Sequence, residues 1–256
     1  MEVILIFFLA HWYLSLFFQT FFLHRYASHK AFTMSKGWER VFFVLTWLFQ
    51  GSNYLSPYGY GIMHRMHHAY ADTPDDPHSP KYDESLFKMM WKTKSIYSSI
   101  VKKQMKVDQR FTDDIPEWTW FDTFARSWVS RLFWAGVYIA IYWQFATVWW
   151  LWLLLPIQFM LSPIHGAIIN WFAHKYGYRN FKVGDTSRNF LPFDFLMMGE
   201  SYHNNHHKYG SRANFGGVRW HEIDPTYLAI KLFNALGIIK LSKHKEVSLA
   251  IDKKAA

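Results

Sequence analysis

The chain has 256 residues, of which 51% are hydrophobic and 21% aromatic, and its formal net charge is +9. It contains no cysteine, which excludes disulfide bonds, cysteine-ligated zinc, iron–sulfur clusters and thiolate nucleophiles. Long apolar runs alternate with polar segments, so we expect an integral membrane protein whose excess of Lys and Arg lies in cytoplasmic loops rather than on a nucleic-acid surface.

The first apolar run predicts a transmembrane helix over residues 1–23. Val3 to Phe22 carries no charged side chain, and about 20 apolar residues are enough to cross a bilayer. The run lacks the basic start and the small-residue cleavage site of a signal peptide. Cations follow it at once, so the positive-inside rule places its end in the cytoplasm. Within it, His11 is expected to make an interhelical hydrogen bond rather than to bind a metal.

Two groups of histidines come next in the chain. The first, His24 and His29, has the spacing H-x4-H, and the second, His64, His67 and His68, has the spacing H-x-x-H-H. On a helix, positions i, i+3 and i+4 share a face, so the second group can aim three imidazoles at one place. Residues five apart do not share a face, so either His24 and His29 serve different metals or the helix ends between them.

Residues 41–58 form a weaker apolar stretch between these two groups. If the stretch crossed the membrane once, the two groups would lie on opposite sides and could not share a site. We therefore predict an interfacial segment that does not span the bilayer.

Residues 71–126 are polar and are predicted to be cytoplasmic. A turn-rich segment places His78 between Pro77 and Pro80, where we expect a structural or substrate-facing histidine rather than a ligand. A short amphipathic helix is expected at 87–91, and 102–118 reads as a solvated connector.

Residues 127–172 predict a transmembrane hairpin. Its two apolar runs, 128–145 and 148–169, are joined by a very short link, and Pro156 and Pro163 should kink the second. The hairpin returns the chain to the cytoplasmic side, where Asn170 and His174 lie four residues apart and share a helix face.

Residues 173–240 are expected to form a cytoplasmic cap that ends in an amphipathic helix starting at Asp224-Pro225, and residues 241–256 a tail. The cap repeats the H-x-x-H-H spacing at His203, His206 and His207, with Glu200 three residues ahead.

The number of clustered histidines exceeds what one metal ion can bind and fits an oxygen-activating metal pair. Asn170 could reach a metal directly or through a water. The zinc-protease signature H-E-x-x-H is absent, and Glu200 is better placed to accept a hydrogen bond from a ligand imidazole than to bind metal. The candidate histidine ligands are His24, His29, His64, His67, His68, His174, His203, His206 and His207.

The order of these motifs resembles that of the integral-membrane fatty acid desaturases, most of all the acyl-CoA Δ9 (stearoyl-CoA type) enzymes. The resemblance implies an all-α membrane fold with about three transmembrane helices, interfacial helices and a cytoplasmic cap that holds a di-iron site. It also implies that two iron ions, O₂ and two external electrons introduce a cis double bond, at Δ9, into a saturated acyl chain. Gln50 matches a glutamine that lines the bend of the family's substrate tunnel. The family usually has two transmembrane helices before the first histidine group, whereas this chain has room for one.

Two other readings compete with a desaturase. One is a membrane di-iron hydroxylase or ketolase that acts on a lipid or hydrocarbon, and the other is a non-enzymatic membrane metal-binding protein. The expected partners of the enzyme are a long-chain acyl substrate, with acyl-CoA preferred, membrane lipid, and a ferredoxin-like or cytochrome b5-like electron donor; nucleic acid is not expected. Cations that could attract an acidic donor are Arg25, Lys30, Lys36, Lys175, Arg179, Lys182, Arg188, Lys208, Arg212 and Arg219.

Overall fold

The structure, a computed structural model, describes residues 1–242, so His244 and most of the expected tail lie outside the described residues. The described chain is mostly helical, as predicted, but it also contains one pair of short strands. In chain order the elements are α1 (Glu2–Phe18), η1 (Gln19–Ser28), β1 (Phe32–Met34), α2 (Lys36–Gln50), η2 (Gly51–Asn53), α3 (Pro57–Tyr70), α4 (Leu86–Val101), α5 (Gln109–Thr112), α6 (Thr119–Ala125), α7 (Trp128–Phe145), η3 (Trp149–Leu153), α8 (Leu154–Gln158), α9 (Leu161–Ala167), η4 (Ile168–Phe172), α10 (Ala173–Lys175), α11 (His203–Lys208), α12 (Pro225–Ala235) and β2 (Ile239–Leu241).

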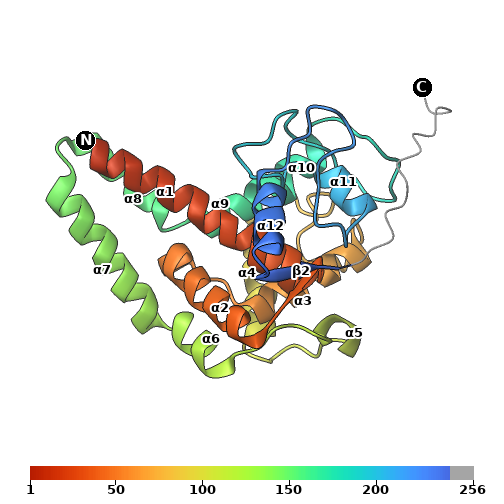
Figure 1. Cartoon of the computed structure of the whole chain (residues 1–256), viewed down its shortest axis with the longest axis horizontal. Coiled ribbons are helices and arrows are strands. Elements are labelled where there is room, and N and C mark those ends of the chain that lie inside the picture. Colours follow the sequence, from red (N-terminus) through yellow and green to blue (C-terminus); the bar gives the residue numbers. More distant parts are fainter. Residues whose placement is uncertain (243–256) are drawn as a thin grey trace.

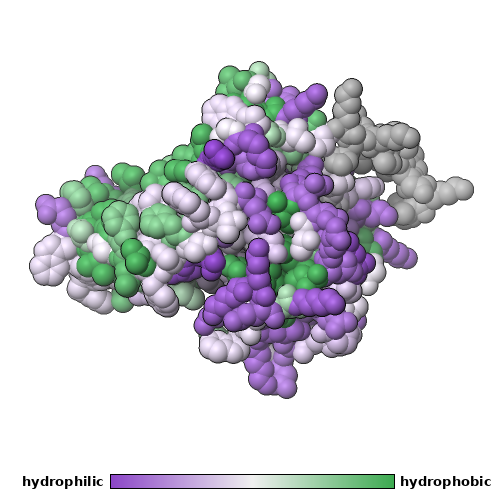
Figure 2. All heavy atoms as spheres, turned by 90° about the horizontal axis from the view of Figure 1, so that it is seen from below, coloured by the Kyte–Doolittle hydropathy of each residue, from purple (hydrophilic) through white to green (hydrophobic). Residues whose placement is uncertain are grey.

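The molecule has a narrow apolar end and a broad polar end. Helices α1, α7 and α8 make the narrow end, at the left of Figure 1, and the loops around α10 and α11 lie at the other end. Hydrophobic residues gather on the surface of the narrow end, and hydrophilic residues dominate the broad end (Figure 2).

One continuous helix is long and apolar enough to cross a membrane. It runs over Glu2–Ser28, 27 residues, because α1 continues directly into the π-helix η1. The segments Trp149–Gln158 and Leu161–Lys175 pass the same test only together, as a pair bent by 68°. The second half of the predicted hairpin is thus a broken helix. Within the described residues, length and composition therefore give one candidate span, or two if the bent pair is a single span.

An aromatic core joins the two ends of the molecule. Phe21 and Phe22 of η1 are fully buried and pack with Phe42 and Phe43 of α2. Burying each such ring contributes about 1.5–3 kcal/mol. This core fixes η1, the segment that carries the first histidine group, against the rest of the fold.

His11 lies in the narrow end and makes interhelical hydrogen bonds, as the sequence suggested. Its Nε2 lies 3.1 Å from the hydroxyl of Tyr138 on α7, and its Nδ1 lies 3.2 Å from the amide nitrogen of Gln158 on α8. Hydrogen bonds between transmembrane helices contribute about 0.6 kcal/mol each on average. His11 thus ties α1 to α7 and α8.

Local sequence signals set several helix starts. The Ser56 hydroxyl accepts a hydrogen bond from the Gly59 amide, and Pro57 occupies the first position of α3. Asp224 caps α12 in the same way, with Pro225 at its first position, as predicted. The helix expected at 87–91 is present but longer than predicted, since α4 runs over Leu86–Val101.

The two strands pair antiparallel, with Phe32 opposite Leu241 and Met34 opposite Ile239. This pairing holds the end of the described chain against the segment that directly follows His29 in the sequence.

Candidate metal centre

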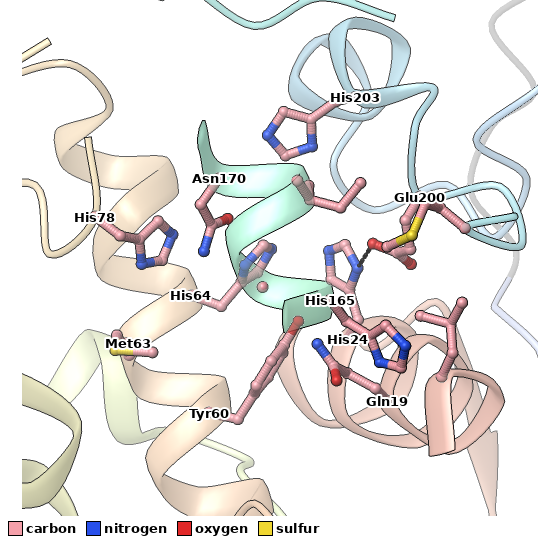
Figure 3. Close-up of a pocket in the computed structure, with 14 residues that line it drawn as sticks. Gln19, His24, Tyr60, Met63, His64, His78, His165, Asn170, Glu200 and His203 are labelled. Atoms are coloured by element: carbon pink, nitrogen blue, oxygen red, sulfur yellow. Dashed lines mark hydrogen bonds and ion pairs between the residues drawn. The ribbon is translucent and has the colours of Figure 1, made fainter. Parts of the chain in front are cut away.

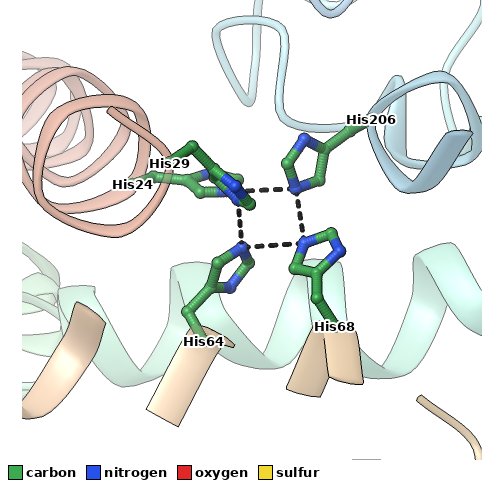
Figure 4. Close-up of side chains that lie close together, drawn as sticks. All are labelled: His24, His29, His64, His68 and His206. Atoms are coloured by element: carbon green, nitrogen blue, oxygen red, sulfur yellow. Dashed lines mark hydrogen bonds between the residues drawn. The ribbon is translucent and has the colours of Figure 1, made fainter. Parts of the chain in front are cut away.

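Five histidines from three distant parts of the chain converge on one point. They are His24, His29, His64, His68 and His206, and their closest ring nitrogens all lie within 4.8 Å of one another. Nε2 of His206 lies 3.0 Å from Nε2 of His24 and 2.8 Å from Nε2 of His68. Nε2 of His64 lies 3.0 Å from Nε2 of His68 and 2.8 Å from Nε2 of His29 (Figure 4).

A second group contains the other four candidate histidines, His67, His174, His203 and His207. Nε2 of His203 lies 3.0 Å from Nε2 of His174, and Nε2 of His67 lies 3.3 Å from Nε2 of His207. The two groups are neighbours, because the rings of His68 and His207 are 4.6 Å apart. The structure therefore brings all nine histidines together; that they bind metal stays a prediction.

The first histidine pair, His24 and His29, joins one group because of the backbone conformation of η1. His24 lies inside the π-helix η1, which ends at Ser28, and the His29 amide donates to the His24 carbonyl, a bond from i to i+5. The helix therefore ends between the two histidines, and both rings enter the five-histidine group. The alternative that they serve different metals is not what the geometry favours.

Carboxylates and a hydroxyl orient the rings from behind. Nδ1 of His24 lies 2.6 Å from Glu200 Oε2, Nδ1 of His67 lies 2.9 Å from Asp76 Oδ1, and Nδ1 of His207 lies 2.9 Å from Asp185 Oδ2. The hydroxyl of Thr186 lies 3.1 Å from Nδ1 of His174. A carboxylate that accepts the Nδ1 hydrogen leaves the Nε2 lone pair free for a metal.

The sequence pointed to only one of these acceptors. Glu200 was expected to accept from a ligand imidazole, and it does accept from His24. Asp76 could have been suspected, because it sits in the Asp-Pro-His motif that follows the second histidine group. Asp185 comes from an irregular loop, where no spacing relates it to His207.

The acceptor groups are held as carboxylates. Burial alone would raise the pKa of Asp76, but the hydrogen bond and charge of His67 outweigh it, and the pKa falls below its usual value. The same balance lowers the pKa of Asp185, through His207, and that of Glu200, through His24 and Arg25. Each acceptor is thus anionic at neutral pH.

Several of the imidazoles are held neutral. Burial lowers the pKa of His64, His68, His203 and His206 well below the usual value, and the neighbouring histidines lower it further. A neutral imidazole is the form that binds metal, because the lone pair must be free of a proton.

These shifts predict how the stability of the metal-free protein depends on pH. In the unfolded chain the histidines would take up protons near pH ~6.5, whereas the buried ones in the folded protein would not. The contribution of these neutral histidines to the free energy of unfolding is therefore present above pH ~6.5. It is lost as the pH falls below that value, by about 1.4 kcal/mol per pH unit for each such histidine. The thermal unfolding midpoint of the chelator-treated protein should drop steeply between pH 7 and 5. An unchanged midpoint over this range would contradict the neutral buried cluster.

A pocket opens beside both histidine groups. Figure 3 shows Asn170, His78 and His165 among the labelled side chains around it, and Leu16 and Met197 add apolar surface. Asn170 thus faces the space next to the candidate metals, as a residue that binds through a water would. His78 is buried against His67, with their rings 4.3 Å apart, and it lines the pocket. Together with His67 and Asp76 it also forms a third group that could hold a metal, so its predicted structural or substrate-facing role stays a prediction.

Gln50 lies at the end of α2 and is fully buried. Its Oε1 accepts from the Leu55 amide at 3.0 Å, and Nε2 has no hydrogen-bond partner. Gln50 does not line the pocket beside the histidines, so its predicted place in a substrate tunnel stays untested.

The two histidine groups fit metal ions. Nitrogens bound at about 2.1 Å to one ion at right angles lie about 3.0 Å apart, which matches the spacing of the facing Nε2 atoms. Where Nδ1 carries the hydrogen, two facing Nε2 lone pairs would repel each other without a cation between them. The number of donors, five and four, matches two ions.

Comparisons with known proteins agree over nearly the whole chain. A family model described as Fatty acid desaturase matches residues 2–234. The Delta-9 desaturase-like 4 protein of Arabidopsis thaliana is 30% identical over 227 residues, 86% of this chain and 69% of the relative. The sn-1 stearoyl-lipid 9-desaturase of Anabaena variabilis is 28% identical over 244 residues, 87% of this chain and 78% of the relative. The Acyl-CoA C20 Delta5-desaturase of Anemone leveillei is 28% identical over 216 residues, 84% of this chain and 65% of the relative.

Proposed function

This chain belongs to the fatty acid desaturase family, and from that premise we propose that it introduces a cis double bond, at Δ9, into a saturated long-chain acyl group. The proposed centre holds two iron ions, uses O₂, and takes two electrons from an external donor. The convergence of nine histidines in groups of five and four carries this proposal.

We assign the metal ions to these two groups. His24, His29, His64, His68 and His206 would hold one ion, and His67, His174, His203 and His207 the other, with Asn170 acting directly or through a water. Iron in these positions would supply the activation of O₂ and the removal of two hydrogens from neighbouring methylenes. Glu200, Asp76 and Asp185 orient the imidazoles, and the buried setting keeps bulk water from the reacting carbons.

The proposed substrate is a long-chain acyl group, with CoA as the preferred carrier. The names of the relatives include both a stearoyl-lipid enzyme and an acyl-CoA enzyme, so the family alone does not choose between them. Assays with each carrier would decide: the proposal expects faster turnover of stearoyl-CoA than of stearoyl-phospholipid.

We further propose an integral membrane protein whose metal centre faces the cytoplasm. About three helices would span: the helix Glu2–Ser28, α7 and the bent pair after it. Exposed apolar side chains on α1 and α7 support this placement, among them Ile6 at 67%, Leu132 at 65% and Trp143 at 80% exposed. Residues 41–58 would lie in the interface, and 71–126 and 173–240 would form the cytoplasmic part of a single desaturase domain.

Expression in a host that lacks its own desaturase tests the function. Lipid analysis with localisation of the double bond should show a new cis-Δ9 acyl chain, and metal analysis should give two metal ions per chain. A hydroxylated product would favour a hydroxylase instead, and metal without any product would favour a metal-binding protein. One metal ion per chain would contradict the di-metal centre.

The electron donor is proposed to be an acidic ferredoxin-like or cytochrome b5-like protein that docks near the third histidine group. Lys208 is exposed and follows His207 directly, and Lys175, Arg179 and Lys182 are exposed in the same cap. Arg25 does not belong to this surface, because it is fully buried and paired with Glu200 and Asp224.

Steering by charge makes a kinetic prediction. With donor limiting, turnover should fall as salt rises, because exposed charges are screened beyond about 10 Å at 0.1 M salt. Lys208→Glu should raise the donor concentration needed for half-maximal rate several-fold without changing the bound metal. Lys102→Glu, an equal change of an exposed cation after α4, is the control and should have little effect. A rate independent of salt would reject this docking surface.

A further inference from the structure

A loop in the cap exposes an unusual amount of apolar surface. Phe193 is 53% exposed, Phe195 59% and Leu196 46%, and Trp220, at 88%, lies with its ring 6.4 Å from that of Phe193. From Phe190 to Gly199 the sequence contains one charged residue, Asp194, and that side chain is 1% exposed. Such a contiguous apolar patch marks a surface that is covered by something other than water.

The backbone of this loop is bonded from within. The buried Asp194 carboxylate accepts from the amides of Met197, Gly199 and Ser201, at 2.8, 2.9 and 2.8 Å. The Phe190 amide donates to the Ser201 carbonyl at 2.8 Å. In hydrocarbon, irregular backbone is tolerated only where its polar groups find partners in the protein. The buried Asp194 carboxylate thus fixes the backbone on the C-terminal side of the exposed side chains, and the Asp194 amide itself donates to the hydroxyl of Tyr202 at 3.2 Å.

The loop also touches the candidate membrane helix within its length. The indole nitrogen of Trp12 donates to the Leu196 carbonyl at 3.3 Å, and residue 12 lies well inside Glu2–Ser28. On the other side of the loop, Met197 packs with Leu16 and Ile169. One side of the exposed patch thus adjoins α1.

We propose that residues 193–196, together with Trp220, are the part of the otherwise cytoplasmic segment 173–240 that inserts into the membrane, and that their partner is the hydrocarbon of the lipid bilayer. The contact with α1, within the length of the candidate membrane helix, favours lipid over a second protein. Because Met197 and Glu200 line the pocket beside the histidines, insertion would set one wall of that pocket at the level of the acyl chains. The proposal does not depend on the reaction that the metal centre performs.

The absence of cysteine allows a direct test on the full chain. Phe195→Cys carries an environment-sensitive fluorophore, and the metal-loaded protein is placed in lipid nanodiscs that contain lipids spin-labelled on the acyl chain. Tyr82→Cys is the matched control, because Tyr82 is an aromatic residue 49% exposed in the predicted cytoplasmic segment. Unchanged metal content shows that each variant folds. If Phe195→Cys fails to fold, Phe193→Cys provides the labelling site instead.

The fluorophore at 195 should shift to shorter wavelength and lose most of its emission to the spin-labelled lipid, while aqueous iodide leaves it unaffected. The fluorophore at 82 should show the reverse pattern. Quenching of position 195 by iodide would overturn the proposal, because the patch would then face water. Protection of position 195 from both quenchers would also overturn it, in favour of coverage by protein.

Discussion

Replacing His206 by alanine is expected to abolish double-bond formation and to remove at least the metal ion of the five-histidine group. Nε2 of His206 faces both His24 and His68, and the side chain is 1% exposed, so alanine would leave a gap in the ring of donors. Product analysis and metal analysis of the same purified sample measure the two effects.

A control must separate the loss of a ligand from the loss of a histidine. His221→Ala is suited to this, because His221 belongs to neither histidine group and contacts Tyr178 and Phe193. This variant should keep its metal and its activity. If His206→Ala kept two metal ions per chain, the assignment of His206 as a ligand would be wrong.

Glu200→Gln is expected to weaken metal binding and activity by about 10–100-fold, the usual cost of losing the acceptor behind a ligand imidazole. Glu200 is anionic and accepts from His24, and it also pairs with Arg25 and bonds Thr20. Glutamine keeps the size of the side chain but removes the charge that orients the ring and strengthens it as a donor to metal. Competition with a chelator measures the change in affinity.

Glu39→Gln provides the matched control for the loss of a buried carboxylate. Glu39 is 4% exposed and is bonded to Tyr26 and Lys36, away from both histidine groups. It should change stability but not metal affinity. Equal loss of metal in both variants would mean that Glu200 acts through the fold and not through His24.

Helical spacing predicted that His64 and His68, four apart, face the same way, and they do share a group. It also placed His67 with them, and this was wrong, because His67 belongs to the four-histidine group with His174, His203 and His207. It left open whether His24 and His29 share a group, since that depends on the π-helix η1, and no residue pattern announces a bond from i to i+5. The acceptor Asp185 was equally out of reach, because its position is set by tertiary packing of a loop rather than by local periodicity.

The predicted membrane helices also show which features the sequence could predict and which it could not. Apolar length identified α1 and α7 as helices, but it could not show that the second half of the hairpin breaks between Gln158 and Leu161. Pro156 and Pro163 were expected to kink this segment, and it is bent by 68° between them. Pro163 lies in the first turn of α9, where a missing amide hydrogen costs nothing, so the bend coincides with the start of a new helix.

Arg25 carries a consequence for how the protein is made in the cell. Its guanidinium is fully buried; it reaches Glu200, 175 residues later, at 3.2 Å and Asp224, 199 residues later, at 2.7 Å. Until those residues have left the ribosome, Arg25 has no acidic partner from the native fold, and a charge without one stays in contact with water. The segment that carries His24 therefore cannot take up its final position during synthesis. The five-histidine group can therefore form only after the chain has been synthesised beyond Asp224, a length that also includes His206.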